Sequence, residues 1–137
     1  MIVTFDFGIF PTTLFVAYKS DFEQLQETFA FDTEDNGYVE LSDKRFGSWD
    51  NSNGVTVSVL EKETIKKGFL VVMATEDLPI HEIANTAAHE AAHVIDMLYK
   101  FIGVEDGIDT EINAYLIGWV TKCIMSVVTN KEVTENE

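Results

Sequence analysis

Cysteine is almost absent from this 137-residue sequence: Cys123 is the only one, so no internal disulfide can form. Cys123 lies in an apolar stretch near the C-terminus, and free cysteines are among the residues most often buried. We therefore expect a buried structural thiol in a protein that does not depend on an oxidising compartment for its stability.

Basic residues are also scarce, because 9 Lys and Arg stand against 24 Asp and Glu, for a formal net charge of −15. Nucleic acids and anionic membranes bind proteins through basic patches. The composition therefore argues against a nucleic-acid or membrane partner, and it favours a neutral or basic protein partner or simple solubility. Acidic surroundings would also attract a divalent cation.

Long apolar runs are missing too. No uncharged apolar run reaches the roughly 18–20 residues that a membrane span needs. The first residues, MIVTFDF, contain no basic region and no cleavage pattern, so they do not predict a signal peptide. Together with the single cysteine, these features predict a cytoplasmic protein of a bacterium or of a phage-infected cell.

The sequence nevertheless contains enough hydrophobic residues to form a core, since they make up 46% of the chain. Apolar runs predict strands at residues 2–7, 14–18, 55–60 and 69–74. A short helix is expected over residues 22–31, and two long helices follow, the first over residues 78–102 with Asp77 as its cap and the second after Asp109.

These elements predict an α+β fold in which a small mixed or antiparallel sheet packs on two long C-terminal helices. We expect residues 1–137 to form a single domain, with a frayed acidic tail over residues 129–137. Residues 32–43 nearly match a calcium-binding loop, but the twelfth position is Asp43 rather than a bidentate Glu. Because Asn36-Gly37 favours a turn with positive φ, a hairpin is the preferred interpretation, and an ion site is the alternative.

The chemistry of the chain is concentrated in the string HEAAH, residues 89–93, inside the first long helix. His89 and His93 are four residues apart, so both imidazoles lie on one helix face and can bind one zinc ion. Glu90 can reach a water molecule beside the ion without binding the ion itself. Two ligands and a general base on one turn form the H-E-x-x-H signature of zinc hydrolases.

A catalytic zinc site needs a third protein ligand from another element. Asp96 and His81, on the same helix, are too far along the axis at a rise of 1.5 Å per residue. Glu111, in the opening turn of the returning helix, is the preferred candidate. Asp109 and Glu105 remain the alternatives.

This arrangement resembles the gluzincin branch of the zinc metallopeptidases, in which two His and a downstream Glu bind zinc. The string EINAY at residues 111–115 is also similar to the second-helix motif of small metallopeptidase-like proteins encoded by phages and prophages. The resemblance covers about residues 69–128. It implies a minimal zincin-like domain with zinc bound by His89, His93 and Glu111.

Other polar residues near the motif have possible supporting roles. Tyr115, four residues after Glu111, could reach the oxyanion of the reaction, or it could simply pack between helices. Asp96 and Asn85 could accept or donate hydrogen bonds to the ligand histidines, or they could be solvated helix residues.

Two functions fit these residues. The first is a zinc-dependent peptidase that cleaves a peptide or protein substrate, with Glu90 as the base. The second is a phage-encoded structural or interaction protein that binds a metal without catalysis. Glu90 favours the peptidase, since a structural site has no use for a base beside its first ligand.

Overall fold

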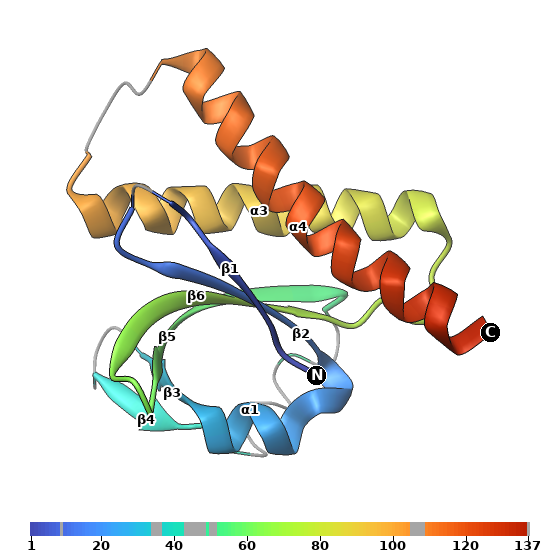
Figure 1. The fold of residues 1–137 in the computed structure, drawn as a ribbon, viewed down its shortest axis with the longest axis horizontal. Coiled ribbons are helices and arrows are strands. Elements are labelled where there is room, and N and C mark those ends of the chain that lie inside the picture. Colours follow the sequence, from blue (N-terminus) through green and yellow to red (C-terminus); the bar gives the residue numbers. More distant parts are fainter. Residues whose placement is uncertain (9, 34–36, 43–48, 50–51, 105–108, 137) are drawn as a thin grey trace. The chain divides into compact units, whose positions relative to one another are not determined.

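The computed structural model describes residues 1–8, 10–33, 37–42, 49, 52–104 and 109–136, with the backbone only for 131–136. The contacts within the chain divide it into two units, Met1–Ala74 and Thr75–Glu137. The first unit contains a six-stranded sheet and the second contains two long helices (Figure 1). The predicted α+β class is therefore confirmed.

The sheet of the first unit is mixed. Its strands are β1 (Val3–Asp6), β2 (Thr13–Tyr18), β3 (Phe29–Asp32), β4 (Tyr38–Glu40), β5 (Gly54–Glu61) and β6 (Lys66–Met73). Their order is β1-β2-β6-β5-β3-β4, and among the described pairs β2 and β6 alone run parallel. β6 lies inside the sheet, and its continuous apolar run is buried on both faces, as is usual for an interior strand.

One face of this sheet and the helix α1 (Phe22–Thr28) enclose the core of the first unit. Leu25 is the buried residue of α1, and it packs with aromatic and β-branched side chains of the strands. The cluster consists of Phe15, Ala17, Leu25, Phe29, Phe31, Leu41, Val57, Val59, Leu70 and Val72.

The helix predicted over residues 22–31 is wrong in its last three residues, because α1 ends at Thr28 and Phe29 begins β3. Phe29 and Phe31 are both fully buried and alternate with partly exposed neighbours, which is the pattern of a strand rather than a helix. β3 pairs with β5 on one side and β4 on the other, so residues 29–32, predicted in part as helix, form a strand of the sheet.

The hairpin interpretation of residues 32–43 is confirmed, since Asp32 pairs with Tyr38 across an antiparallel connection. Gly37 has φ +68°, and its carbonyl oxygen accepts hydrogen bonds from the backbone N–H and the hydroxyl of Thr33. Residues 34–36 and 43 lie outside the described residues, so the alternative of an ion site stays a prediction.

The second unit consists of α3 (Ile80–Ile102) and α4 (Thr110–Asn136), which contact each other. The predicted cap Asp77 is wrong, and Pro79 is the N-cap. Asp77 lies instead in a turn before the helix, in which the Leu78 N–H donates to the Thr75 carbonyl. α3 ends at Gly103 with φ +79°, as predicted for a glycine stop. α4 continues to Asn136 and so includes the tail that we expected to fray.

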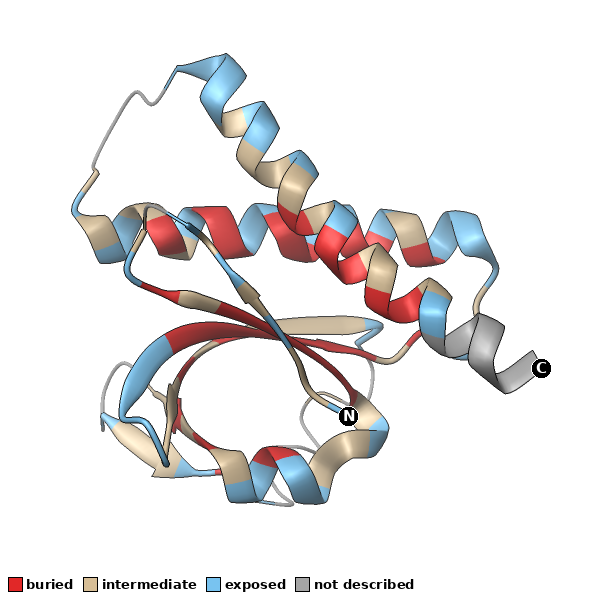
Figure 2. Ribbon diagram, in the orientation of Figure 1, coloured by how far each residue is buried: buried red, intermediate tan, exposed pale blue. Residues whose placement is uncertain are grey.

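Each long helix has a buried face and an exposed face (Figure 2). The buried residues of α3 are Ile83, Thr86, Ala87, Glu90, Ala91, Val94, Ile95 and Leu98. On α4, Val120, Cys123, Ile124, Val127 and Val128 are buried. Burial raises the pKa of the Cys123 thiol, and the burial predicted for this cysteine is confirmed.

Part of α4 has the length and composition of a membrane span. Within the described residues, Thr110–Asn130 is the one helical segment that meets both criteria, and 28% of its apolar 18-residue stretch is buried. The core helix of a protein without any membrane segment meets the same criteria.

Gly68 allows β2 and β6 to approach closely. A Cβ atom at this position would lie 2.6 Å from a ring carbon of Phe15 and 2.7 Å from the carbonyl oxygen of Thr13.

We expect Gly68→Ala to lower the free energy of unfolding by about 1–3 kcal/mol, measured by urea denaturation, because the backbone oxygen cannot move aside without distorting the strand. The control Thr4→Ala, on the exposed part of β1, should change it by less than about 0.5 kcal/mol. A Gly68→Ala variant as stable as the parent would contradict this close approach.

Candidate metal centre

His89 and His93 lie on successive turns of α3 with their Nε2 atoms 3.2 Å apart. Both side chains are exposed, and their rings meet edge to face with centroids 4.8 Å apart. Two nitrogens at 2.0–2.1 Å from a tetrahedral zinc ion are themselves about 3.3–3.4 Å apart. The pair therefore has nearly the spacing that zinc requires, and both nitrogens are accessible to an ion from solvent.

Glu90 lies beside this pair but on the buried side of α3, with 4% of its surface exposed. Its Oε1 atom is 4.0 Å from Nε2 of His89. This distance leaves the carboxylate outside direct contact with the ring but close enough to share a water molecule with it. A carboxylate buried beside a His pair has the proximity that a general base requires.

The third predicted ligand, Glu111, is in the first turn of α4. The described residues contain no group of three or more His, Cys, Asp or Glu side chains placed to hold a metal ion. The structure thus brings together His89, His93 and Glu90, but it does not bring Glu111 to them. Asp109, one of the alternatives, accepts a hydrogen bond of 2.8 Å from the Glu111 N–H and so caps α4. Glu105 lies outside the described residues.

The possible supporting residues lie as follows. Asp96 forms an ion pair of 3.1 Å with Lys100, so its carboxylate is directed along the helix surface and not to a histidine. Asn85 is exposed on α3, one turn before His89. Tyr115 is 75% exposed, so it does not pack between the helices.

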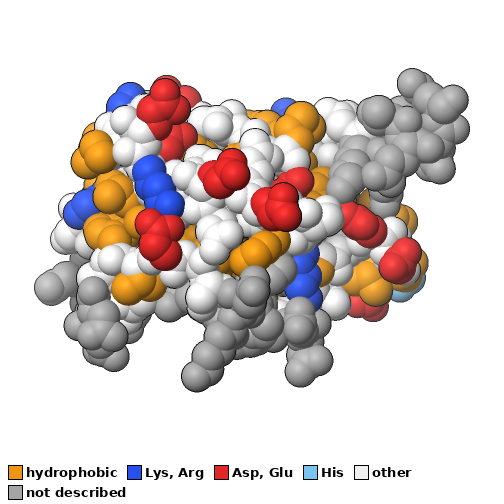
Figure 3. Space-filling model, turned by 90° about the horizontal axis from the view of Figure 1, so that it is seen from below, with side chains coloured by type: hydrophobic (Ala, Val, Ile, Leu, Met, Phe, Trp, Pro, Cys, Tyr) orange, Lys and Arg blue, Asp and Glu red, His pale blue; other side chains and the backbone are white. Residues whose placement is uncertain are grey.

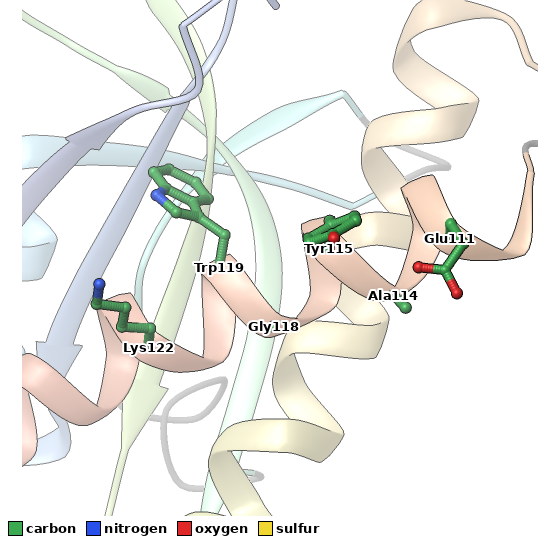
Figure 4. Close-up of a pocket in the computed structure, with 6 residues that line it drawn as sticks. All are labelled: Glu111, Ala114, Tyr115, Gly118, Trp119 and Lys122. Atoms are coloured by element: carbon green, nitrogen blue, oxygen red, sulfur yellow. The ribbon is translucent and has the colours of Figure 1, made fainter.

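Two features of the second unit were missed by sequence reasoning. Tyr99 of α3 donates a hydrogen bond of 2.8 Å to Asn113 of α4, and burial raises the pKa of Tyr99, which keeps this donor protonated. The other feature is a hollow on α4 that includes Glu111 and Tyr115 (Figure 4). The recurrence of its lining residues every three or four positions was the signal that could have revealed it.

On the face drawn in Figure 3, acidic and basic side chains are interspersed, and the basic ones do not gather into a patch. Three lysines close together in the sequence, Lys62, Lys66 and Lys67, lie at the end of the β5–β6 hairpin, where Lys62 pairs with Glu40 at 2.5 Å.

Comparison of the chain with protein-family models, with curated proteins and with solved structures finds no match. The resemblance to gluzincins therefore depends on the motif at residues 89–93 and on residues 111–115.

Proposed function

We propose that the protein is a zinc-dependent peptidase that acts on a peptide or protein substrate in the cytoplasm of a bacterium or a phage-infected cell. The observation that carries the proposal is the 3.2 Å separation of the Nε2 atoms of His89 and His93. The Glu90 carboxylate, 4.0 Å from the first of these nitrogens, supports it.

His89 and His93 would hold the zinc ion through neutral imidazole nitrogens. When bound, zinc activates a water molecule as a nucleophile and polarises the carbonyl group of the substrate. Glu90 accepts the proton of that water molecule and returns it to the nitrogen of the leaving amine. Glu90 is buried, and we propose that this burial limits the movement of its carboxylate between the two proton transfers.

Glu111 is the third ligand that we propose for the ion. For this role the first turn of α4 has to bring the carboxylate to the His pair, which requires a different placement of that turn from the one described here. Tyr115 would move with Glu111, since both are on one face of α4, and we propose that its hydroxyl donates to the oxyanion of the reaction.

Metal content and turnover of the purified protein test the proposal. We expect one zinc ion per chain by elemental analysis, and hydrolysis of an unfolded protein such as labelled casein that stops when a chelator removes the metal. Zinc without hydrolysis would favour the non-catalytic metal-binding protein. A chain that binds no zinc would contradict both functions.

The third ligand is tested by Glu111→Ala. We expect zinc affinity, measured by calorimetric titration, to fall by about 10-fold or more, because one of three protein ligands is lost. The variant should lose thermal stability only when zinc is present. The control Glu82→Ala removes an exposed carboxylate of α3 and should leave the affinity unchanged. Equal affinity in Glu111→Ala and the parent would show that the ligand set is wrong, and Asp109→Ala would then be the next variant.

A further inference from the structure

One face of α4, here called the outer face, carries a hollow of about 480 Å³. The residues that line it recur every three or four positions, so they form one stripe along the helix. They are Glu111, Ala114, Tyr115, Gly118, Trp119 and Lys122. Figure 4 shows Glu111 and Lys122 at the two ends of the stripe, with the two aromatic rings between them.

The outer face exposes large apolar side chains beside the hollow. Tyr115 is 75% exposed, and the neighbouring Ile112 is 52% exposed. A Cβ atom built on Gly118 meets nothing within 4 Å, so the space above this glycine is open. An exposed apolar stripe with charged ends is typical of a surface that binds another protein.

The side chains of the stripe match those of a second copy of the stripe that runs in the opposite direction. An antiparallel second helix, centred between residues 116 and 117, places Lys122 of the second copy against Glu111 of the first. By symmetry the same ion pair forms again at the other end. We propose that two copies of this chain associate through the outer faces of α4, about a two-fold axis perpendicular to the helices.

The same alignment matches side chains by size. Tyr115 of each copy lies against Gly118 of the other, and Trp119 lies against Ala114. A large side chain thus meets a small one at each of these positions, which allows two helices to approach closely with their surfaces interlocked. The open space above Gly118 is where the second copy's Tyr115 fits.

A membrane fits the outer face less well than a second copy does. Glu111 and Lys122 are about 16 Å apart along the axis at 1.5 Å per residue, and the hydrocarbon core of a bilayer is about 30 Å thick. A transbilayer orientation would therefore place at least one of these charges in hydrocarbon. The net charge of −15 also opposes binding to an anionic membrane surface.

The dimer does not depend on the proposed peptidase function, because it uses Glu111 where the structure has it, on the outer face. Binding of zinc by Glu111 would turn the same carboxylate toward the His pair. The association is therefore measured with the full chain in the presence of a chelator.

Sedimentation equilibrium of charge-reversal variants tests the dimer. We expect the parent chain to dimerise, and Glu111→Lys or Lys122→Glu to weaken the dimer by about 10-fold or more, because two attractive pairs become repulsive. The double variant, with both reversals, should restore the affinity to within about threefold of the parent, since it forms the same pairs with opposite polarity. Gly118→Leu, which fills the hollow, should also give monomers.

Circular dichroism of each variant serves as the control for folding, and rescue by the double reversal cannot come from a misfolded chain. A parent chain that stays monomeric would overturn the proposal. So would a dimer that neither single reversal weakens, or a monomer that binds phosphatidylcholine vesicles.

Discussion

Glu90→Gln is expected to keep zinc bound and to lower the rate of peptide hydrolysis by a factor of about 10²–10⁴. Gln has nearly the size and shape of Glu, so it fits the same buried position beside His89. Its amide can neither accept the proton of the nucleophilic water nor return a proton to the leaving amine. Turnover of labelled casein and elemental analysis of zinc, on the same preparation, measure the two halves of this prediction.

The matched control is Glu82→Gln, which changes an exposed carboxylate on the same helix near His81. Its turnover should equal that of the parent. Unchanged turnover in Glu90→Gln would remove this residue as the base and with it the mechanism proposed above. Loss of zinc together with activity would show instead that Glu90 supports the histidines.

Phe29→Ala is expected to lower the free energy of unfolding by about 3–5 kcal/mol. The ring of Phe29 is fully buried at the start of β3, with its centroid 4.7 Å from that of Phe15. Removing it leaves a cavity in the core of the first unit, lined by residues of α1 and the sheet. Urea denaturation of the full chain, followed by fluorescence and circular dichroism, measures the effect.

Phe101→Ala provides the comparison, because this phenylalanine is 41% exposed at the end of α3. The same chemical change should cost about 1 kcal/mol or less there. Similar losses in the two variants would mean that Phe29 is not part of a packed core.

The error at Phe29 shows where local patterns are insufficient. Phe22, Leu25 and Phe29 have the spacing of a helix face, and Phe29 and Phe31 have the spacing of a strand face. Phe29 belongs to both patterns, so the boundary depends on whether neighbouring strands exist to pair with the segment. β5 does so here, with Phe29 opposite Glu61, and this is a contact that a window of ten residues cannot contain.

For the candidate site too, the sequence predicts the part that depends on local helix geometry but not the part that depends on contacts between helices. The approach of His89 to His93 follows from the helix itself, because residues four apart are neighbours on any α-helix. The position of Glu111 depends instead on how α4 crosses α3, which the sequence near the motif does not determine. The Tyr99–Asn113 hydrogen bond, one of the contacts between these helices, was not predicted for the same reason.

The parallel pairing of β2 with β6 has a consequence for the order of folding. β5 and β6 are joined by a short turn and can pair as a hairpin within microseconds. β2 joins β6 only after a long segment of chain has closed, as the hydrogen bond from Thr12 to the Lys67 carbonyl spans 55 residues. Loops of this length slow folding, so the free edge of β6 in the β5–β6 hairpin stays unpaired until β2 arrives. That apolar edge, Phe69 to Met73, is the segment most exposed to aggregation while the protein folds.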